Sequence, residues 1–406
     1  MQNHLVIKWW DGSNVGLLAQ RGSIFFEYDE AWLARGHNLS PLSLPFTHAV
    51  FNAAKAPEGL PGLIADCLPD KWGRRVAERD FAQHGYGELT AMKLLAWRGE
   101  RGLGALKIEP ALGDKGSATL GKLAQISTAA LARGAKEIQR GVPSKVLPQL
   151  VRGGTAGGAY PKTVVVAYDD GTLSVDPPDG LGTPSILKFD LSPKGDQAPV
   201  ELAYLEMARK AGINSVAARL IDEGGRTKRR HLLVGRFDVV RNDPRRRIHF
   251  HSASALLHRE ANALDYRDLF KIAIRLGVDA SGIREVARRM VFNLLASNHD
   301  DHGKNHAFMY DEDSKSWALT PAFDLTYIEG MLDRGMLICG EVWPKRETLE
   351  ALCLDAGIKK AEFAEIFDSV SAAIGSWKAI ARKAGVSADL VKEIGARHVW
   401  IRSSVG

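Results

Sequence analysis

A dense cluster of polar side chains occupies residues 297–305, which read Ser-Asn-His-Asp-Asp-His-Gly-Lys-Asn. Asp300 stands five residues before Asn305, and a further carboxylate, Asp324, ends the short apolar segment 318–323. Magnesium-dependent phosphoryl transfer needs one carboxylate that orients a hydroxyl and two oxygen ligands that hold the metal on the nucleotide's phosphates. The residue types and their spacing therefore predict a kinase, and the spacing to Asn305 selects Asp300 rather than Asp301.

An Asp and an Asn at this spacing also occur by chance, so the interpretation needs support from the elements around the cluster. Those elements supply it. A helix that ends directly at the cluster is predicted by one apolar stripe with helical spacing: Ile283, Val286, Ala287, Met290, Val291, Leu294 and Leu295. Asp324 follows a short extended segment, as the second metal-binding carboxylate of a kinase does. A packed helix would therefore position the polar residues.

A β-rich region precedes these elements and carries candidate phosphate-binding groups. Gly153, Gly154, Gly157 and Gly158 lie in a glycine-rich loop, where backbone N–H groups can approach phosphates, although such clusters also mark plain turns. Lys188 is the single charged residue of an apolar strand at 185–189 and could bind phosphate, or it could face water at a sheet edge. Glu201, in a predicted helix over 200–212, could pair with Lys188.

Two alternatives remain open at this point. His299, His302 and His306, with the neighbouring carboxylates, could bind the metals of a phosphohydrolase. Basic runs at 226–230 and 245–247 could contact nucleic acid, or they could be solvated loops that flank a strand.

The composition is that of a globular protein, with 406 residues, 45 % hydrophobic and 25 % charged, and a net charge of +6. The three cysteines, Cys67, Cys339 and Cys353, predict neither a disulfide framework nor a zinc site. Because a basic leader and an apolar run of about 18 residues are both missing, we expect a cytoplasmic protein that does not enter a membrane.

The pattern of elements predicts an α+β protein. We expect a mixed helix and strand subdomain over 1–110, a connector over 111–142, a β-rich lobe over 143–250 and an all-helical lobe over 251–406. Within the last region, amphipathic helices are expected from about 361 to 384 and from 388 to 402.

Many segments, in one order along the chain, resemble the HipA family of serine/threonine kinases, the toxins of bacterial type II toxin–antitoxin modules. They are residues 41–45, 63–75 with Leu68-Pro69-Asp70, 102–106, 155–162, 186–188, 201–212, 236–238, 300–305 and 319–324. The resemblance implies a bilobed protein-kinase-like fold with a β-rich nucleotide lobe.

The resemblance also implies roles for single residues, with ATP and Mg²⁺ as cofactors. Asp300 would be the catalytic base, Asn305 and Asp324 would hold Mg²⁺, and Lys188 would contact the phosphates. The remaining nucleotide contacts would come from the glycine-rich loop, the hinge and the loop after Asp300: Thr155, Gly157, Gly158, Ala159, Tyr160, Pro161, Lys162, Gly235, Arg236, Phe237, His302, Gly303 and Lys304.

Two positions depart from the family pattern. Thr155 stands where members with a self-regulatory phosphorylation site have serine, and Gly235 opens the hinge where a carboxylate is usual. The resemblance further implies a protein substrate such as a translation component, and a HipB-like helix-turn-helix antitoxin through which DNA is reached. The alternative function that it leaves open is a DNA-associated co-repressor with little kinase activity.

Overall fold

The structure is a computed structural model that describes residues 3–112, 126–154, 156–175, 181–225, 227–240, 242–331 and 333–405. The chain divides into two compact units, which are described separately: unit 1 is Met1–Gly195 with Arg219–Phe250, and unit 2 is Asp196–Ala218 with His251–Gly406. The expected boundaries at 110, 142 and 250 stay predictions. Among the described residues, no helix has the length and apolar character that crossing a bilayer requires.

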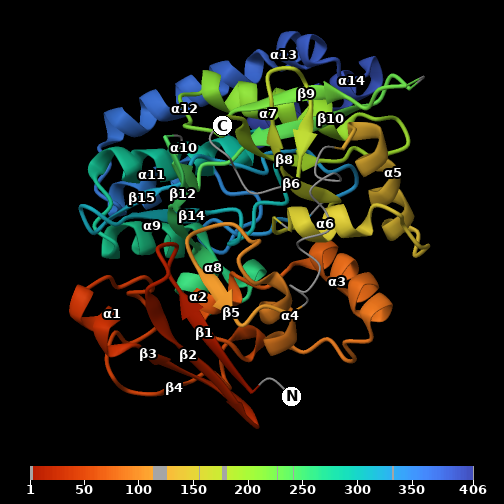
Figure 1. The fold of residues 1–406 in the computed structure, drawn as a ribbon. Coiled ribbons are helices and arrows are strands. Elements are labelled where there is room, and N and C mark those ends of the chain that lie inside the picture. Colours follow the sequence, from red (N-terminus) through yellow and green to blue (C-terminus); the bar gives the residue numbers. More distant parts are fainter. Residues whose placement is uncertain are drawn as a thin grey trace. The chain divides into compact units, whose positions relative to one another are not determined.

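Unit 1 begins with a five-stranded sheet, and helices lie between its strands in the sequence (Figure 1). Leu5, Ile7 and Trp9 alternate with more exposed residues, so the first strand turns one face to a core. The sheet has the order β4-β3-β2-β1-β5, with β1 His4–Lys8, β2 Asn14–Arg21, β3 Ser23–Tyr28, β4 Phe51–Asn52 and β5 Lys107–Glu109. The helices are α1 Glu30–Arg35, α2 Gly62–Ala65, α3 Lys71–His84 and α4 Ala91–Arg98.

Between α4 and β5 the backbone follows an irregular path, which Arg98 holds in place. The buried guanidinium of Arg98 donates to the carbonyl oxygens of Leu103 (2.8 Å) and Leu106 (2.9 Å). A side chain at position 102 would collide with Arg98, since a Cβ there would lie 2.0 Å from its Nε. Glycine is therefore needed here to admit the guanidinium.

The second sheet of unit 1 is the expected β-rich region. Its order is β7-β6-β8-β10-β9, with β6 Lys162–Ala167, β7 Leu173–Ser174, β8 Thr183–Lys188, β9 Ala218–Asp222 and β10 Arg230–Gly235. Lys188 is paired in register with Lys162 on one side and with Leu232 on the other. Lys188 thus belongs to a central strand, and the alternative that it lies at a sheet edge is wrong.

Regular structure is present in the expected connector and in one of the basic runs. The segment 111–142 contains a helix, α5 Thr128–Gln139, capped by Ser127 and buried along Leu131, Ala135 and Ile138, followed by α6 Leu147–Gly153. Residues 113–125 lie outside the described part. The basic run 245–247 is not a loop, because it ends β12 Asp243–Arg247, which pairs with β11 Val239–Val240.

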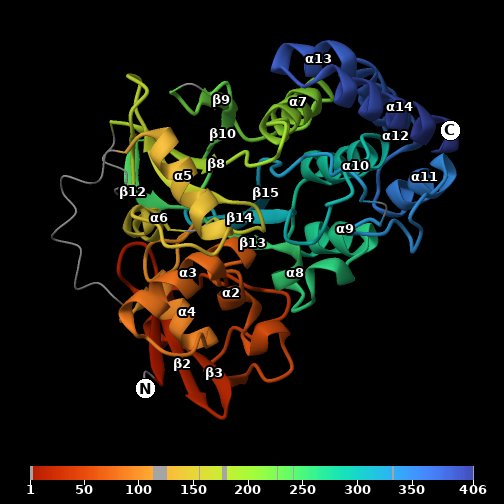
Figure 2. The same cartoon turned by 90° about the vertical axis from the view of Figure 1, so that its right-hand side faces the viewer.

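Unit 2 is built mainly from helices, whose arrangement Figure 2 shows from the side. Helix α10 contacts α9, α12 and α14, and α7 contacts α12 and α13. The helices are α7 Gln197–Lys210, α8 Ala253–Leu256, α9 Tyr266–Arg275, α10 Ala280–Leu295, α11 Arg346–Asp355, α12 Lys360–Gly375, α13 Trp377–Ala384 and α14 Ala388–Val405. The single helix expected over 361–384 is interrupted at Ser376, directly after Gly375.

The α+β class is confirmed, with one refinement. Residues 251–406 also carry strands: β14 Ala307–Asp311 and β15 Ser316–Leu319 form an antiparallel hairpin, and β13 His249–Ser252 completes the sheet order β13-β14-β15. The hairpin follows the polar cluster directly and leads into Asp324. The expectation of an all-helical lobe missed it because its alternating segments are only four and five residues long.

Candidate active site

The polar cluster forms a loop, residues 297–305, that begins where α10 ends. Helix α10 is buried along the predicted stripe. The carbonyl of Ala296, which caps this helix, accepts hydrogen bonds from the hydroxyl of Tyr204 on α7 (2.6 Å) and from Nε2 of His398 on α14 (3.1 Å). Ser297 then adopts a left-handed backbone conformation, with φ 56°. The start of the loop is thus fixed by three helices of unit 2.

The two adjacent carboxylates of the loop lie in opposite environments. The side chain of Asp300 is 33 % exposed, and its Oδ1 lies 3.9 Å from Nε2 of His302. The side chain of Asp301 is 1 % exposed and accepts hydrogen bonds from the Tyr266 hydroxyl (2.6 Å) and from Nε2 of His306 (2.5 Å). Asp300 is accessible to a substrate, and Asp301 is committed to the interior.

Asp301 is the centre of a buried polar network. The side chain of Arg334 is completely buried, and its guanidinium lies 3.4 Å from Oδ2 of Asp301. The same guanidinium donates to the carbonyl of Asn293. Burial alone would raise the pKa of Asp301, but His306, Arg334 and the Tyr266 hydroxyl together lower it below the usual value. Burial and Asp301 in turn raise the pKa of Tyr266. Asp301 is therefore an anion that the fold depends on.

The β14–β15 hairpin brings the two candidate metal ligands to one end. Asn305 lies two residues before β14, and Asp324 follows β15 by five residues. Thr320 donates from its backbone N–H to the carbonyl of Ala307, so the two chains remain paired beyond β15. The amide nitrogen of Asn305 donates to the carbonyl of Asp300 (2.7 Å), which leaves the amide oxygen available as a ligand.

The segment before Asp324 is held from two sides. Arg289 on α10 donates to the carbonyl of Thr320 (2.7 Å), and the backbone of Ala322 is bonded to Asn214 and Val216. Asp324 itself has φ 54°, a left-handed conformation that costs a non-glycine residue free energy. Strain of this kind persists where the surroundings impose it, and functional residues are a frequent reason.

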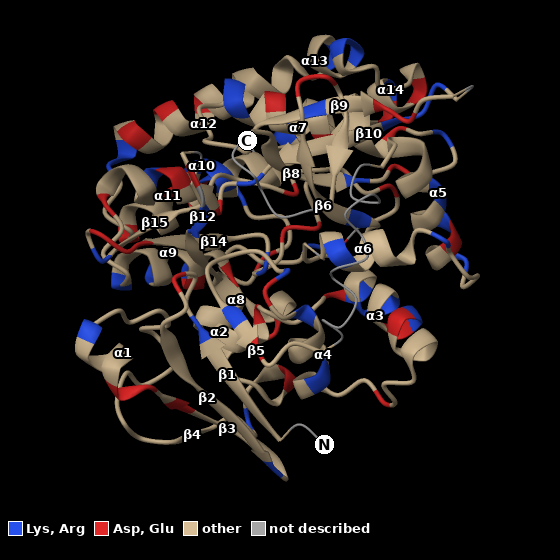
Figure 3. Cartoon of the chain, viewed as in Figure 1, with Lys and Arg blue, Asp and Glu red and all other residues tan. Residues whose placement is uncertain are grey.

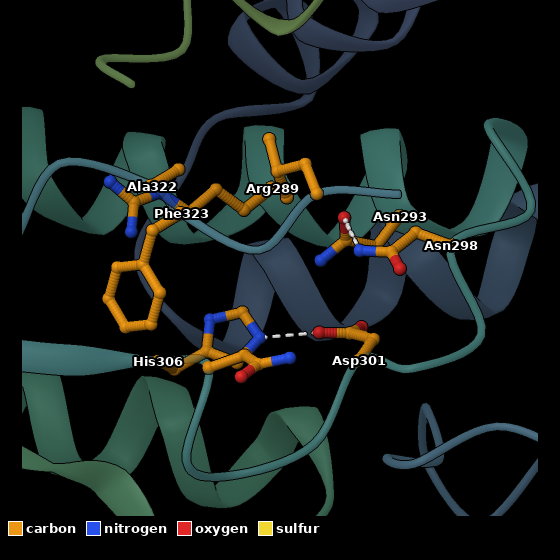
Figure 4. A pocket seen from close by; sticks show the side chains of 9 residues that line it. Arg289, Asn293, Asn298, Asp301, His306, Ala322 and Phe323 are labelled. Carbon is orange, nitrogen blue, oxygen red and sulfur yellow. Dashed lines mark hydrogen bonds and ion pairs between the residues drawn. The ribbon is translucent and has the colours of Figure 1, made fainter. Parts of the chain in front are cut away.

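A small pocket lies between the polar loop and this segment (Figure 4). Its walls are formed by Arg289, Asn293, Asn298, Asp301, Asn305, His306, Ala322, Phe323 and Leu325. In Figure 4 the His306 ring points to the Asp301 carboxylate, and the amides of Asn293 and Asn298 meet. Asn305 and both neighbours of Asp324 thus share one polar cavity.

These residues fit a magnesium ion. Mg²⁺ prefers oxygen ligands, keeps several water molecules, and is held in kinases by one or two protein ligands together with phosphates. Asn305 supplies an amide oxygen and Asp324 a carboxylate. The pocket also offers two buried atoms, Asn298 Oδ1 and His306 Nδ1, that have no hydrogen-bond partner within the described residues and could bind the water of a hydrated ion.

The other loop residues play different parts. Gly303 packs tightly, because a Cβ there would lie 3.0–3.1 Å from Leu264, the carbonyl of Ala261 and Ser254. Its backbone N–H also donates to Ala261 (2.9 Å). The structure therefore gives Gly303 a packing role, whereas His302 is half-buried and Lys304 is exposed on the loop.

In unit 1, the glycine-rich loop connects α6 to β6, and of its predicted residues Thr155 lies outside the described part. Gly157 and Gly158 precede Ala159, Tyr160 and Pro161, and Lys162 begins β6. The ammonium of Lys162, which is 5 % exposed, donates to the carbonyl of Gly157 (2.6 Å). Because Lys188 pairs with Lys162, two lysines stand beside each other where this loop meets the sheet.

The predicted hinge continues β10. Gly235 pairs with Ser185, and the backbone N–H of Arg236 donates to the carbonyl of Pro184 (3.0 Å). The guanidinium of Arg236 makes a bidentate pair with the buried carboxylate of Asp238 (2.6 and 2.9 Å), and Phe237 packs against Phe250. The side chain of Arg236 is therefore committed within unit 1, and any adenine contact here would use backbone atoms.

Several of these supporting residues have no signal in the sequence. Tyr266 and Arg334 reach the loop at Asp301, and Arg289 reaches the segment before Asp324, from positions that no spacing rule connects. The one hint is the helical position of Arg289 and Asn293, which places polar side chains among the buried apolar residues of α10.

The sequence was compared with known families and proteins. Residues 6–109 match the HipA N-terminal domain, and residues 154–377 match the HipA-like C-terminal domain. The chain is 26 % identical over 401 residues to the "Putative kinase Y4mE" of Sinorhizobium fredii, covering 95 % of this chain and 86 % of the relative. It is 28 % identical over 173 residues to the "Putative kinase Y4dM" of the same organism, covering 38 % and 41 %.

One solved structure covers nearly the whole chain. It is the complex of HipA, HipB and operator DNA from the toxin–antitoxin system of Shewanella oneidensis, with a TM-score of 0.70 and 17 % identity, and the match covers 99 % of this chain and 96 % of that one. At this identity the likeness establishes a shared fold.

Proposed function

The chain belongs to the HipA family, and from that premise we propose that it is a protein kinase that transfers the γ-phosphate of ATP, with Mg²⁺, to a serine or threonine hydroxyl of a protein. The observation that carries the proposal is the contrast within the polar loop, where an accessible Asp300 adjoins a buried Asp301 and precedes Asn305 at the pocket beside Asp324. This arrangement supplies one base and two metal ligands.

In the proposed mechanism, the residues of unit 2 handle the proton and the metal. The Asp300 carboxylate accepts a hydrogen bond from the substrate hydroxyl and takes its proton as the phosphoryl group is transferred. Asn305 and Asp324 would hold Mg²⁺, which neutralises phosphate charge when bound. The network around Asp301 keeps the loop rigid, so that little reorganisation is needed during the reaction.

The residues of unit 1 would bind the nucleotide. Lys188 supplies a cation to the phosphates, and the glycine-rich loop with Lys162 supplies a second cation and backbone donors. The backbone at Gly235 and Phe237 would receive adenine. Phosphorylation of Thr155 within the loop is part of the proposal, and intact mass spectrometry after incubation with MgATP would detect it.

The test of this function is labelling with radioactive ATP. We expect the wild-type chain to transfer ³²P from γ-labelled ATP to protein in the presence of Mg²⁺. The Asp300→Ala variant should lose at least about 10²-fold of that rate, since the proton acceptor is gone. The fold of the variant should be intact by circular dichroism. Labelling by Asp300→Ala at the wild-type rate would reject the assignment.

A helix-turn-helix antitoxin of the HipB kind is the proposed partner, and DNA would be reached through it. Family membership supports this proposal. The basic side chains give direct DNA binding little support. Arg229 donates to the carbonyls of Asp190 and Ser192, and in Figure 3 basic segments are interspersed with acidic ones along α3. Salt-dependent binding of operator DNA by the isolated chain would instead favour the co-repressor alternative.

The phosphohydrolase alternative finds no support in the geometry. Nε2 of His306 is bonded to Asp301, and Nε2 of His299 to the hydroxyl of Ser297 (2.9 Å). In the part of the chain that the structure covers, no three His, Cys, Asp or Glu side chains gather as metal ligands. A two-metal hydrolase site would need such a group.

A further inference from the structure

The glycine-rich loop is held by residues of the N-terminal region, at the start of helix α3. The backbone N–H of Gly158 donates to Oδ2 of Asp70 (2.7 Å). The indole Nε1 of Trp72 donates to the carbonyl of Lys162 (2.7 Å), and the backbone N–H of Trp72 lies 3.4 Å from the carbonyl of Gly158. Residues 70–72 are thus hydrogen-bonded to the loop at Gly158 and at Lys162, the first residue of β6.

Asp70 makes this contact in place of its ordinary local one. It occupies the N-cap position of α3, where an aspartate normally accepts a hydrogen bond from the second or third N–H of its own helix. No such capping bond to the side chain is formed here. The carboxylate accepts from Gly158 instead, so the first turn of α3 lacks the side-chain cap that would stabilise it.

The glycines of the loop match this arrangement. A Cβ at position 157 would lie 2.8 Å from Oδ2 of Asp70, and a Cβ at position 158, where φ is +106°, would lie 2.6 Å from the ammonium of Lys162. Glycine is therefore required at both positions so that the backbone can lie close to the side chains of Asp70 and Lys162, in addition to the predicted phosphates.

We propose that Asp70 is a positioning residue for nucleotide binding, which acts by anchoring the glycine-rich loop to the N-terminal region. The inference rests on the proposed kinase function, in which this loop covers the phosphates. An anchored loop has lost its conformational freedom before ATP arrives, so binding does not have to pay for ordering it. The N-terminal region would then control the affinity for ATP without touching the nucleotide.

The test compares two substitutions at one position in the full-length chain. Asp70→Asn keeps an oxygen that can accept from Gly158, whereas Asp70→Ala removes it. We expect Asp70→Ala to weaken binding of MgATP, or of its non-hydrolysable analogue, about tenfold, which is about 1.4 kcal/mol. Asp70→Asn should stay within about threefold of wild type, and kcat at saturating ATP should change less than KM in both variants.

Hydrogen exchange in the absence of nucleotide reports on the anchor independently of catalysis. Peptides covering residues 156–162 should exchange faster in Asp70→Ala than in wild type, and should be restored in Asp70→Asn. The control is Glu58→Ala, which removes a carboxylate paired with Arg74 of the same helix (3.0 Å) and should change neither exchange in the loop nor nucleotide affinity.

The proposal is overturned if Asp70→Ala binds MgATP like wild type, if its loop exchanges like wild type, or if Asp70→Asn is as defective as Asp70→Ala. A wild-type chain that binds no MgATP would refute the proposed function instead. The exchange experiment separates the two cases, because it needs no nucleotide.

Discussion

Replacing Asp301 by asparagine should destabilise unit 2 much more than the same change at Asp300. The new amide would keep the size of the side chain and one acceptor oxygen, but it would remove the negative charge that faces Arg334 and His306. Both partners are almost fully buried, at 0 % and 3 % side-chain exposure. The substitution therefore leaves a buried guanidinium without its counter-charge.

The expected loss in free energy of unfolding follows from the burial of the network around Asp301. Removing one partner of a buried ion pair typically costs about 3–5 kcal/mol, because the remaining charge is not solvated. The Tyr266 hydroxyl, which donates to Asp301 at 2.6 Å, can still donate to an amide oxygen, so we expect the lower part of this range, about 3 kcal/mol. Asp300→Asn, at a partly exposed side chain, should cost about 0.5 kcal/mol or less.

Urea unfolding followed by circular dichroism measures the difference. With a slope of about 2–3 kcal/mol per molar urea, the midpoint of the transition of unit 2 should fall by about 1 M or more in Asp301→Asn and by less than about 0.3 M in Asp300→Asn. Equal midpoints for the two variants would refute the assignment of a structural role to Asp301 and of a catalytic role to Asp300.

Three further predictions concern the metal, the phosphates and pH. Asp324→Asn should raise the Mg²⁺ concentration for half-maximal labelling at least about tenfold, because a charged ligand is lost, and an unchanged Mg²⁺ titration would remove Asp324 from the metal site. Lys188→Met should raise KM for MgATP about tenfold or more, measured by initial rates; an unaltered KM would exclude the phosphate contact. Burial lowers the pKa of His398 to about 4 despite its bond to Ala296, so the neutral form is favoured in the fold and stability is complete above about pH 6.5. As pH falls toward 4 this contribution, about 3 kcal/mol, should be lost, and His398→Gln should flatten the dependence of urea midpoints on pH.

Elements with a clear period were predicted well from the sequence. The stripe on α10 follows from a spacing of 3.6 residues and the strand β8 from an apolar run, and both elements are present. Local interactions decide these elements, so local sequence is sufficient. The irregular path after α4 was missed, because it depends on where the side chain of Arg98 lies.

In the candidate site too, local features could be predicted from the sequence and contacts between distant segments could not. The contrast between Asp300 and Asp301 could be anticipated from the spacing to Asn305, since both residues lie in one short loop. The partners of Asp301 could not, because Tyr266 and Arg334 come from α9 and from a segment beyond the hairpin. The grip of Asp70 on Gly158 joins residues 88 positions apart, and an N-cap aspartate ordinarily predicts only a helix start.

The central claim is that Asp300 is the base of a kinase, and transfer of ³²P from γ-labelled MgATP to protein hydroxyl groups tests it most directly. Purified wild-type chain and Asp300→Asn, matched for stability by urea unfolding, would be incubated with an extract of cellular proteins. The account predicts Mg²⁺-dependent labelling of serine or threonine by the wild type and a loss of at least about 10²-fold in the variant. Equal labelling by both chains, or none by the wild type, would contradict it.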